Sequence, residues 1–451
     1  MTILGRFSAI SILVLSLIPI SLAQISISKI QKKALLNGFE IYFLPPLQQD
    51  VSQFTLMIKN GAAFDPTGKW GVTNLMIRML LNGGSKKFSP EHIKQNFEAM
   101  DVRIQNRVEW DAVFISGKVP TSQLSNTLSI LAEIIVNPDF TEEKFQQEKK
   151  LLLQEFQLQH NLHDSTQSVF RRKLFGPNPY ARAVKGTIES IANLSLVDVK
   201  IQYRKLIMPN QAQLALYYDD FDNKLFFSMG RPWGGWVRSE PAPFTFRKAS
   251  VSTDKRIVLI DSVASKSVIR VGGLTIAKSD RSYYPFKVLE HYLTLSLPDW
   301  AREIENSNQI RGSVSFSSMH MPGDFQITLQ VEHSHVGDYL RKCLNTLDHL
   351  AAGEINLKRY QEAKELAFLA LKQRLENPKE QLVELLEANL YGLGISYLVN
   401  FGLRLDRVQP HQFSEMIARY LKEDSLIIVV SGPAPKISES LSQFGPFQLL
   451  K

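Results

Sequence analysis

The chain has 451 residues, enough for two or three domains of ordinary size. Apolar residues make up 44% and charged residues 21%, which excludes a disordered or collagen-like chain. Lysine and arginine (52) exceed aspartate and glutamate (44), but no run of five basic residues occurs, so we expect no nucleic-acid partner. The single cysteine, Cys343, rules out an internal disulfide and a thiolate metal cluster.

The first 23 residues have the pattern of a secretory signal peptide. Arg6 precedes a nearly continuous, uncharged apolar run from Ala9 to Leu22, and residues 21–23 fit the small-x-small cleavage pattern. The run is short for a membrane span. We therefore expect residues 1–23 to be removed on export, which would leave a mature protein without a membrane anchor.

The first half of the mature chain alternates strand and helix patterns. Apolar residues recur with a helical period from Val72 and stop before Gly83-Gly84, as at a helix C-terminus. Ser89 and Pro90 have the composition of an N-cap and first helical residue. The other elements expected here are strands at 38–44, 53–61 and 112–119 and helices at 124–135 and from 141 to at least 159.

The second half repeats this order. The strands expected are 267–273 and 324–331, and the helices are about 284–297, 336–350 and 357–375. Each half closes with a helix that ends near a tyrosine, Tyr203 or Tyr420, and then an apolar strand. This match predicts a duplication.

These patterns predict two similar domains, 24–230 and 251–451, joined by a linker at 231–250 that is rich in proline and glycine. Trp233 and Trp236 lie in this linker, and we expect them to pack the halves together rather than to bind a ligand.

Three segments occur in a characteristic order: residues 69–85, residues 148–155, and Pro179-Tyr180 followed by Gly186-Thr187. With the order of the elements around them, they resemble the family of pitrilysin, insulinase and the mitochondrial processing peptidase, the inverzincin peptidases. The resemblance covers essentially the whole mature chain. It implies an α+β fold of two homologous halves, each a mainly antiparallel sheet packed against helices.

Active members of that family carry H-x-x-E-H on the first helix, where two histidines bind zinc and the glutamate is the general base. The matching residues here are Asn74, Ile77 and Arg78, while Glu155 matches the third zinc ligand. An amide is a poor zinc ligand beside imidazole, an aliphatic side chain accepts no proton, and arginine stays cationic. The resemblance therefore implies a degenerate site with no catalytic residue and no zinc.

The retained Glu155 suggests a substitute for the metal. We hypothesise that Arg78 pairs with Glu155 and joins the two helices as zinc would; the alternative is that both are ordinary solvated charges. The segment 300–303 resembles the arginine part of a substrate-contacting arginine and tyrosine pair, which makes Arg302 a candidate substrate contact. The tyrosine is absent from residues 307–315, so Arg302 is equally an ordinary surface residue.

Two histidine pairs, His160 with His163 and His333 with His335, have spacings that could place both rings on one face of a helix or a strand. Neither pair has a convincing third ligand, and we expect solvated polar residues at both.

The resemblance implies a non-catalytic subunit that pairs with a homologous zinc-bearing peptidase subunit, lines a chamber and binds extended peptide, in the periplasm or, alternatively, secreted. A second hypothesis is a stand-alone periplasmic peptide-binding or assembly factor on the same fold. A third is a hydrolase with an unrecognised site, although no nucleophile and base pair is visible in the sequence.

Overall fold

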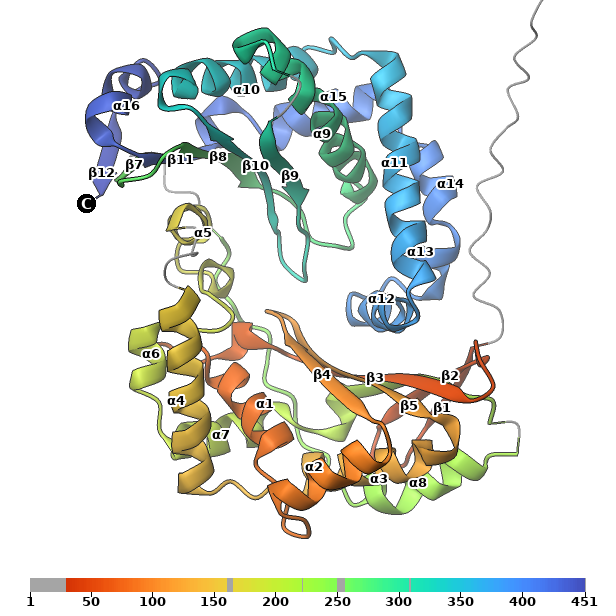
Figure 1. Cartoon of the computed structure of the whole chain (residues 1–451). Coiled ribbons are helices and arrows are strands. Elements are labelled where there is room, and N and C mark those ends of the chain that lie inside the picture. The colour runs from red at the N-terminus through yellow and green to blue at the C-terminus, as the bar shows by residue number, and fades with distance from the viewer. Residues whose placement is uncertain (1–29, 160–164, 221, 250–255, 308–309, 451) are drawn as a thin grey trace, which may run out of the picture.

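The computed structural model describes residues 30–159, 165–220, 222–249, 256–307 and 310–450 (Figure 1). The expected signal peptide and the pair His160 and His163 lie outside these residues. Within the described ranges, no helix is both long and apolar enough to cross a membrane.

The N-terminal half is built on a six-stranded sheet in the order β1-β2-β6-β3-β5-β4. β2 and β6 are parallel, and the other neighbours are antiparallel. The pairs β1–β2 and β4–β5 join consecutive strands, whereas β3 pairs with β5 and β6 across longer connections. Its strands are β1 (Gln31–Ala34), β2 (Glu40–Leu44), β3 (Val51–Lys59), β4 (Arg103–Val108), β5 (Ala112–Pro120) and β6 (Ala212–Tyr217).

Helices cover one face of this sheet and bury a large apolar core between helix and strand (Figure 1). The predicted helix from Val72 forms α1, which ends before Gly83. The Ser89 side chain accepts the N–H of His92 at 3.2 Å and caps α2 as predicted. The helices of this half are α1 (Val72–Asn82), α2 (Pro90–Ala99), α3 (Leu124–Val136), α4 (Glu142–Gln159), α5 (Ser165–Phe175), α6 (Ile188–Ala192), α7 (Leu196–Leu206) and α8 (Lys224–Gly234).

The C-terminal half has a second six-stranded sheet in the order β12-β7-β11-β8-β10-β9. Its pairs β12–β7 and β7–β11 are parallel and the rest antiparallel. Its strands are β7 (Ile257–Asp261), β8 (Ser267–Leu274), β9 (Arg311–Phe316), β10 (Asp324–Val331), β11 (Ile427–Gly432) and β12 (Phe447–Leu450). Its helices are α9 (Tyr283–Glu305), α10 (Val336–Ala351), α11 (Leu357–Glu376), α12 (Pro378–Leu390), α13 (Ile395–Val399), α14 (Phe401–Asp406), α15 (Pro410–Tyr420) and α16 (Ala434–Ser442).

The two sheets share one plan. The run β2-β6-β3-β5-β4 of the first sheet corresponds in order and direction to β7-β11-β8-β10-β9 of the second. This correspondence confirms the predicted α+β fold of two homologous halves. The predicted helix at 284–297 is longer than expected, because α9 continues through Pro298 to Glu305.

Each half places one helix on the sheet of the other half. α5, which follows the long helix α4, packs on β8 and β11 of the second sheet. α12, which follows the long helix α11, packs on β3 and β6 of the first. Because β8 and β11 are the counterparts of β3 and β6, the exchange is reciprocal. Both sheets are thus covered on their second face by a helix from the opposite half (Figure 1).

The tryptophans of the expected linker belong to the N-terminal half. Trp233 lies within α8 and stacks on Phe39, with ring centroids 4.8 Å apart, and Trp236 packs on the same ring. Both are buried in the first core. The expectation that they pack the halves together is therefore wrong. α8 extends to Gly234, so the first residues of the 231–250 segment are helical.

Candidate functional site

The start of α1 is held by a buried carboxylate. Asp65 accepts the backbone N–H groups of Gly71 at 2.6 Å and Thr73 at 3.2 Å, which are unpaired donors of the first turn. Gly71 has φ +88°, and a Cβ there would lie 2.5 Å from Lys185 O, so glycine is required. Burial raises the pKa of Asp65 to about 7, against the lowering effect of its hydrogen bonds. These contacts fix the direction of α1 and the side chains it carries.

Arg78 lies between two glutamates of α4. Its Nη1 is 2.8 Å from Glu155 Oε1, and its Nε donates to Glu148 Oε2 at 3.2 Å. The predicted pair of Arg78 and Glu155 is therefore present. Glu148 is the more deeply buried partner, with 3% of its side chain exposed against 43% for Glu155. Asn82, one turn after Arg78, donates to the other Glu148 oxygen at 3.2 Å. One guanidinium thus joins α1 to α4 through two carboxylates.

These residues do not fit a zinc ion. The position of the second histidine holds a cation that already occupies both carboxylates. Asn74 is largely buried, and Ile77 is fully buried in the first core, where it takes part in packing. Within the described ranges, no group of three or more histidine, cysteine, aspartate or glutamate residues could hold a metal ion. What this arrangement can do is hold two helices together by charge-assisted hydrogen bonds.

The other candidates lie elsewhere. Arg302 is on α9 of the C-terminal half, its side chain is 61% exposed, and it pairs with Asp299 at 3.1 Å within the same helix. His333 and His335 lie in a 3₁₀ turn (His333–His335) rather than on a strand. His333 Nδ1 is 2.8 Å from the hydroxyl oxygen of Ser267, and Ser267 is fully buried.

Sequence reasoning gave Glu148 no role. The signal was its spacing: residues seven apart on a helix differ by two turns and share a face. Because Glu155 was already expected to point at α1, Glu148 could have been expected to do so as well.

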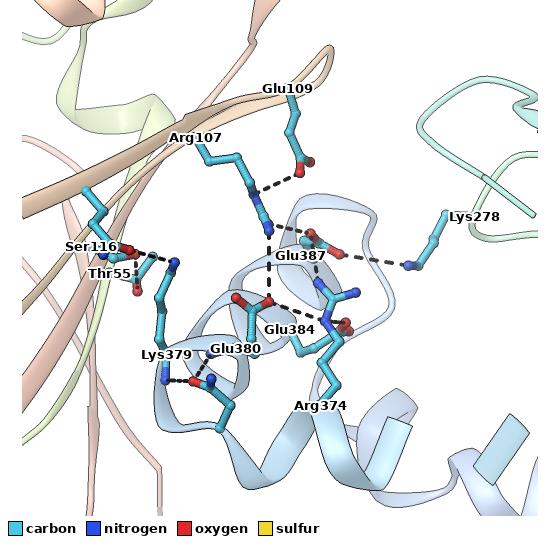
Figure 2. A network of polar contacts seen from close by, with 12 residues as sticks. Thr55, Arg107, Glu109, Ser116, Lys278, Arg374, Lys379, Glu380, Glu384 and Glu387 are labelled. Carbon is cyan, nitrogen blue, oxygen red and sulfur yellow. Dashed lines mark hydrogen bonds and ion pairs between the residues drawn. The ribbon is translucent and has the colours of Figure 1, made fainter. Parts of the chain in front are cut away.

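A second polar cluster lies where α12 meets the first sheet (Figure 2). Arg107 of β4 contacts Glu109 at 2.9 Å and Glu387 of α12 at 3.5 Å. Arg374, near the end of α11, lies 2.9 Å from Glu384. These residues are up to 280 positions apart in the chain. Together with Lys278 and Glu380, they form a junction cluster that joins the two halves (Figure 2).

The pKa of Glu387 is raised to about 7, mainly by burial and also by the nearby Glu384 and Glu109, while Lys278 and Arg374 oppose the rise. Burial likewise raises the pKa of Glu109. The cluster therefore holds carboxyl groups in an environment that favours a proton on Glu387.

Residues 46–187 match the model of the family described as Insulinase (Peptidase family M16), and this segment includes Arg78, Glu148 and Glu155. An uncharacterised zinc protease of Rickettsia bellii is 23% identical over 137 residues, 30% of this chain and 33% of the relative. The non-peptidase homologue YmxG of Helicobacter pylori is 22% identical over 162 residues, 36% of this chain and 37% of the relative. The chain thus matches about a third of the length of each curated relative.

Solved structures match over most of the chain. A protease from Helicobacter pylori superposes with a TM-score of 0.80 at 15% identity, over 90% of this chain and 100% of the other. A peptidase M16 inactive domain from Pseudomonas fluorescens gives 0.79 at 19% identity, over 90% and 98%. At these identities the likeness establishes the fold. Residues 46–187 thus match the insulinase family, peptidase family M16, and the described residues have the fold of these two solved structures.

Proposed function

We propose that this chain is a non-catalytic insulinase-family subunit, exported to the periplasm, that pairs with a zinc-bearing homologue and helps to form a peptide-binding chamber. The observation that carries the proposal is the contact of Arg78 with Glu148 and Glu155, because it puts a permanent cation where active relatives need a metal ligand. Buried Ile77 leaves no general base at the motif. Catalysis would have to come from the partner.

Peptide binding is supported by the edge of the first sheet. β4 is the last strand in the sheet order and pairs with β5 alone among the described strands. It packs beside α1, the helix that carries Arg78. An extended peptide can add to such an edge through backbone hydrogen bonds, which need no catalytic side chain. The peptide would then lie next to the degenerate site.

The reciprocal helix exchange favours a second candidate. Because α5 and α12 cover the sheets from within the chain, the fold closes on itself without another subunit. A stand-alone peptide-binding or assembly factor would have the same internal contacts. The two candidates differ in whether a zinc-bearing homologue accompanies the chain.

The test is native purification under mild conditions, with identification of copurifying proteins by mass spectrometry and a zinc count on the same sample. We expect a stoichiometric homologue with an intact H-x-x-E-H motif and about one zinc per pair. Recovery of the chain alone and without metal would overturn the subunit proposal and support the second candidate.

Hydrogen exchange tests the peptide-binding part separately. Addition of an unstructured peptide should slow exchange of the β4 amides, because they would gain backbone partners. β1, the opposite edge of the same sheet, is the internal control. Unchanged exchange at β4 at a saturating peptide concentration would contradict this part.

A further inference from the structure

A pocket in the C-terminal half gathers positive charge away from Arg78. It has a volume of about 460 Å³ and lies between the turn before α9 and the helices α13–α15. This volume is in the range of small-molecule sites. Its charged lining residues are four cations, Lys278, Arg281, Arg404 and Arg407, and one carboxylate, Asp280.

Among the described residues, most of this charge has no carboxylate counter-ion. Lys278 lies 3.9 Å from Glu387 of the junction cluster. In the part of the chain that the structure describes, no ion pair joins Arg281, Arg404 or Arg407 to a carboxylate. Asp280 already accepts the N–H of Ser282 at 2.8 Å in the turn before α9. Three guanidinium groups around one cavity repel each other, so an anion bound among them would be stabilised.

The pocket also has an aromatic wall. Tyr283, Tyr284 and Tyr397 line it and are buried. Arg404 Nη1 donates to the Tyr284 hydroxyl oxygen at 3.2 Å, which leaves the hydroxyl proton for another acceptor. Burial raises the pKa of Tyr284, so this hydroxyl remains a donor at neutral pH. The tyrosine rings offer an apolar surface beside the cations.

We propose that this pocket binds a compact dianionic group, either a phosphate monoester or two neighbouring carboxylates, whose attached ring or aliphatic body lies against the tyrosines. Guanidinium groups recognise both kinds of anion through paired N–H donors, which gives the two sources a shared chemistry. The site needs neither a zinc-bearing partner nor the β4 edge, so it stands or fails independently of the proposed function.

Isothermal titration of the full chain tests the site with two probes, phenyl phosphate and the dipeptide diglutamate, and with benzyl alcohol as the uncharged control. We expect one of the charged probes to bind with 1:1 stoichiometry and with an affinity that falls as salt is added. The double variant Arg281→Gln/Arg407→Gln should weaken this binding by about tenfold or more, because it removes two of the charge-assisted donors.

The matched control is Arg311→Gln, an exposed arginine on β9 outside this pocket. Tyr284→Phe should weaken binding by several-fold through loss of one donor. Preference for phenyl phosphate would assign the site to phosphate esters, and preference for diglutamate to acidic peptides. Absence of binding by both probes at about 10 mM, or equal binding by the wild type and the double variant, would overturn the proposal.

Discussion

Arg171 of α5 and Asp324 of β10 form a buried ion pair between the two halves, with Nη1 and Oδ1 3.1 Å apart. The same guanidinium donates to Tyr180 O at 2.9 Å and lies over the Trp110 ring, 4.1 Å from its centroid. Its cost of burial is offset only while these partners are present. The pair therefore ties the position of α5 to the second sheet.

Arg171→Met should lower the free energy of unfolding by about 3–5 kcal/mol, because the buried Asp324 would lose its ion-pair partner. Chemical denaturation followed by circular dichroism measures the change. Arg172→Met is the matched control, since Arg172 is the next residue of α5 and is exposed. Equal effects of both substitutions would contradict a specific role for the pair.

Gly272→Ala should disrupt the packing of α5 on the second sheet. A Cβ at Gly272 would lie 1.9 Å from Phe325 O and 2.9 Å from the Phe170 ring, so strand or helix must move. At Gly273 the nearest atom would be at 3.2 Å, which makes Gly273→Ala a milder control. We expect a drop in melting temperature that is clearly larger for Gly272→Ala. Comparable melting temperatures would show that β8 accommodates the methyl group.

Restoration of the motif by Asn74→His/Ile77→Glu/Arg78→His should create a zinc site with Glu155. The triple variant places two imidazoles one turn apart on α1 and frees the carboxylate that Arg78 occupies. About one zinc per chain is expected by elemental analysis, against none in the wild type. The same variant with Glu155→Gln is the control and should bind zinc more weakly. A triple variant that folds but takes up no zinc would show that α1 and α4 are not placed for metal binding.

Acidification should stabilise the junction of the halves. Because burial raises the pKa of Glu387 from its ordinary 4.5 to about 7, the folded state holds a proton on Glu387 that the unfolded state lacks between these values. This contribution to stability is present below about pH 4.5 and is lost as the pH rises through about 7. Burial raises the pKa of Asp65 in the same way, so the total dependence is a sum over groups.

Glu387→Gln isolates the contribution of Glu387, since the amide does not titrate. Unfolding curves between pH 5 and pH 8 should show a shallower loss of stability with rising pH in this variant than in the wild type. Glu362→Gln, an exposed substitution on α11, controls for the charge change. Parallel curves for wild type and Glu387→Gln would contradict the assignment.

The sequence was informative where local periodicity determines structure. The helix from Val72 and the strands around it were predicted because their apolar residues recur with one clear period. The pair of Arg78 and Glu155 was predicted because both positions were placed by the spacing of a resembled motif. In the resembled fold, the helices that carry these two positions face each other.

Other features had no local signal. The pattern of α12 shows that the helix has an apolar face, but Leu382 and Leu386 do not encode which sheet they meet. Arg107 and Glu387 are 280 positions apart in the chain. The apolar periodicity of a segment indicates its own secondary structure and does not indicate which distant residue it will contact. Trp233 and Trp236 were misplaced because glycine and proline around them suggested a linker, whereas their contacts with Phe39 hold that segment on the first core.

The exchange of α5 and α12 makes the two halves complementary fragments rather than independent modules. If the chain were cut near residue 240, the N-terminal fragment would keep α5 but lack the second sheet on which α5 packs. The same fragment would expose the apolar face of the first sheet that α12 covers in the whole chain. A pseudo-twofold exchange of equivalent helices is the arrangement of a domain-swapped homodimer, here within one chain. Because both copies are in one chain, the exchange forms without the dependence on protein concentration that a swapped homodimer has.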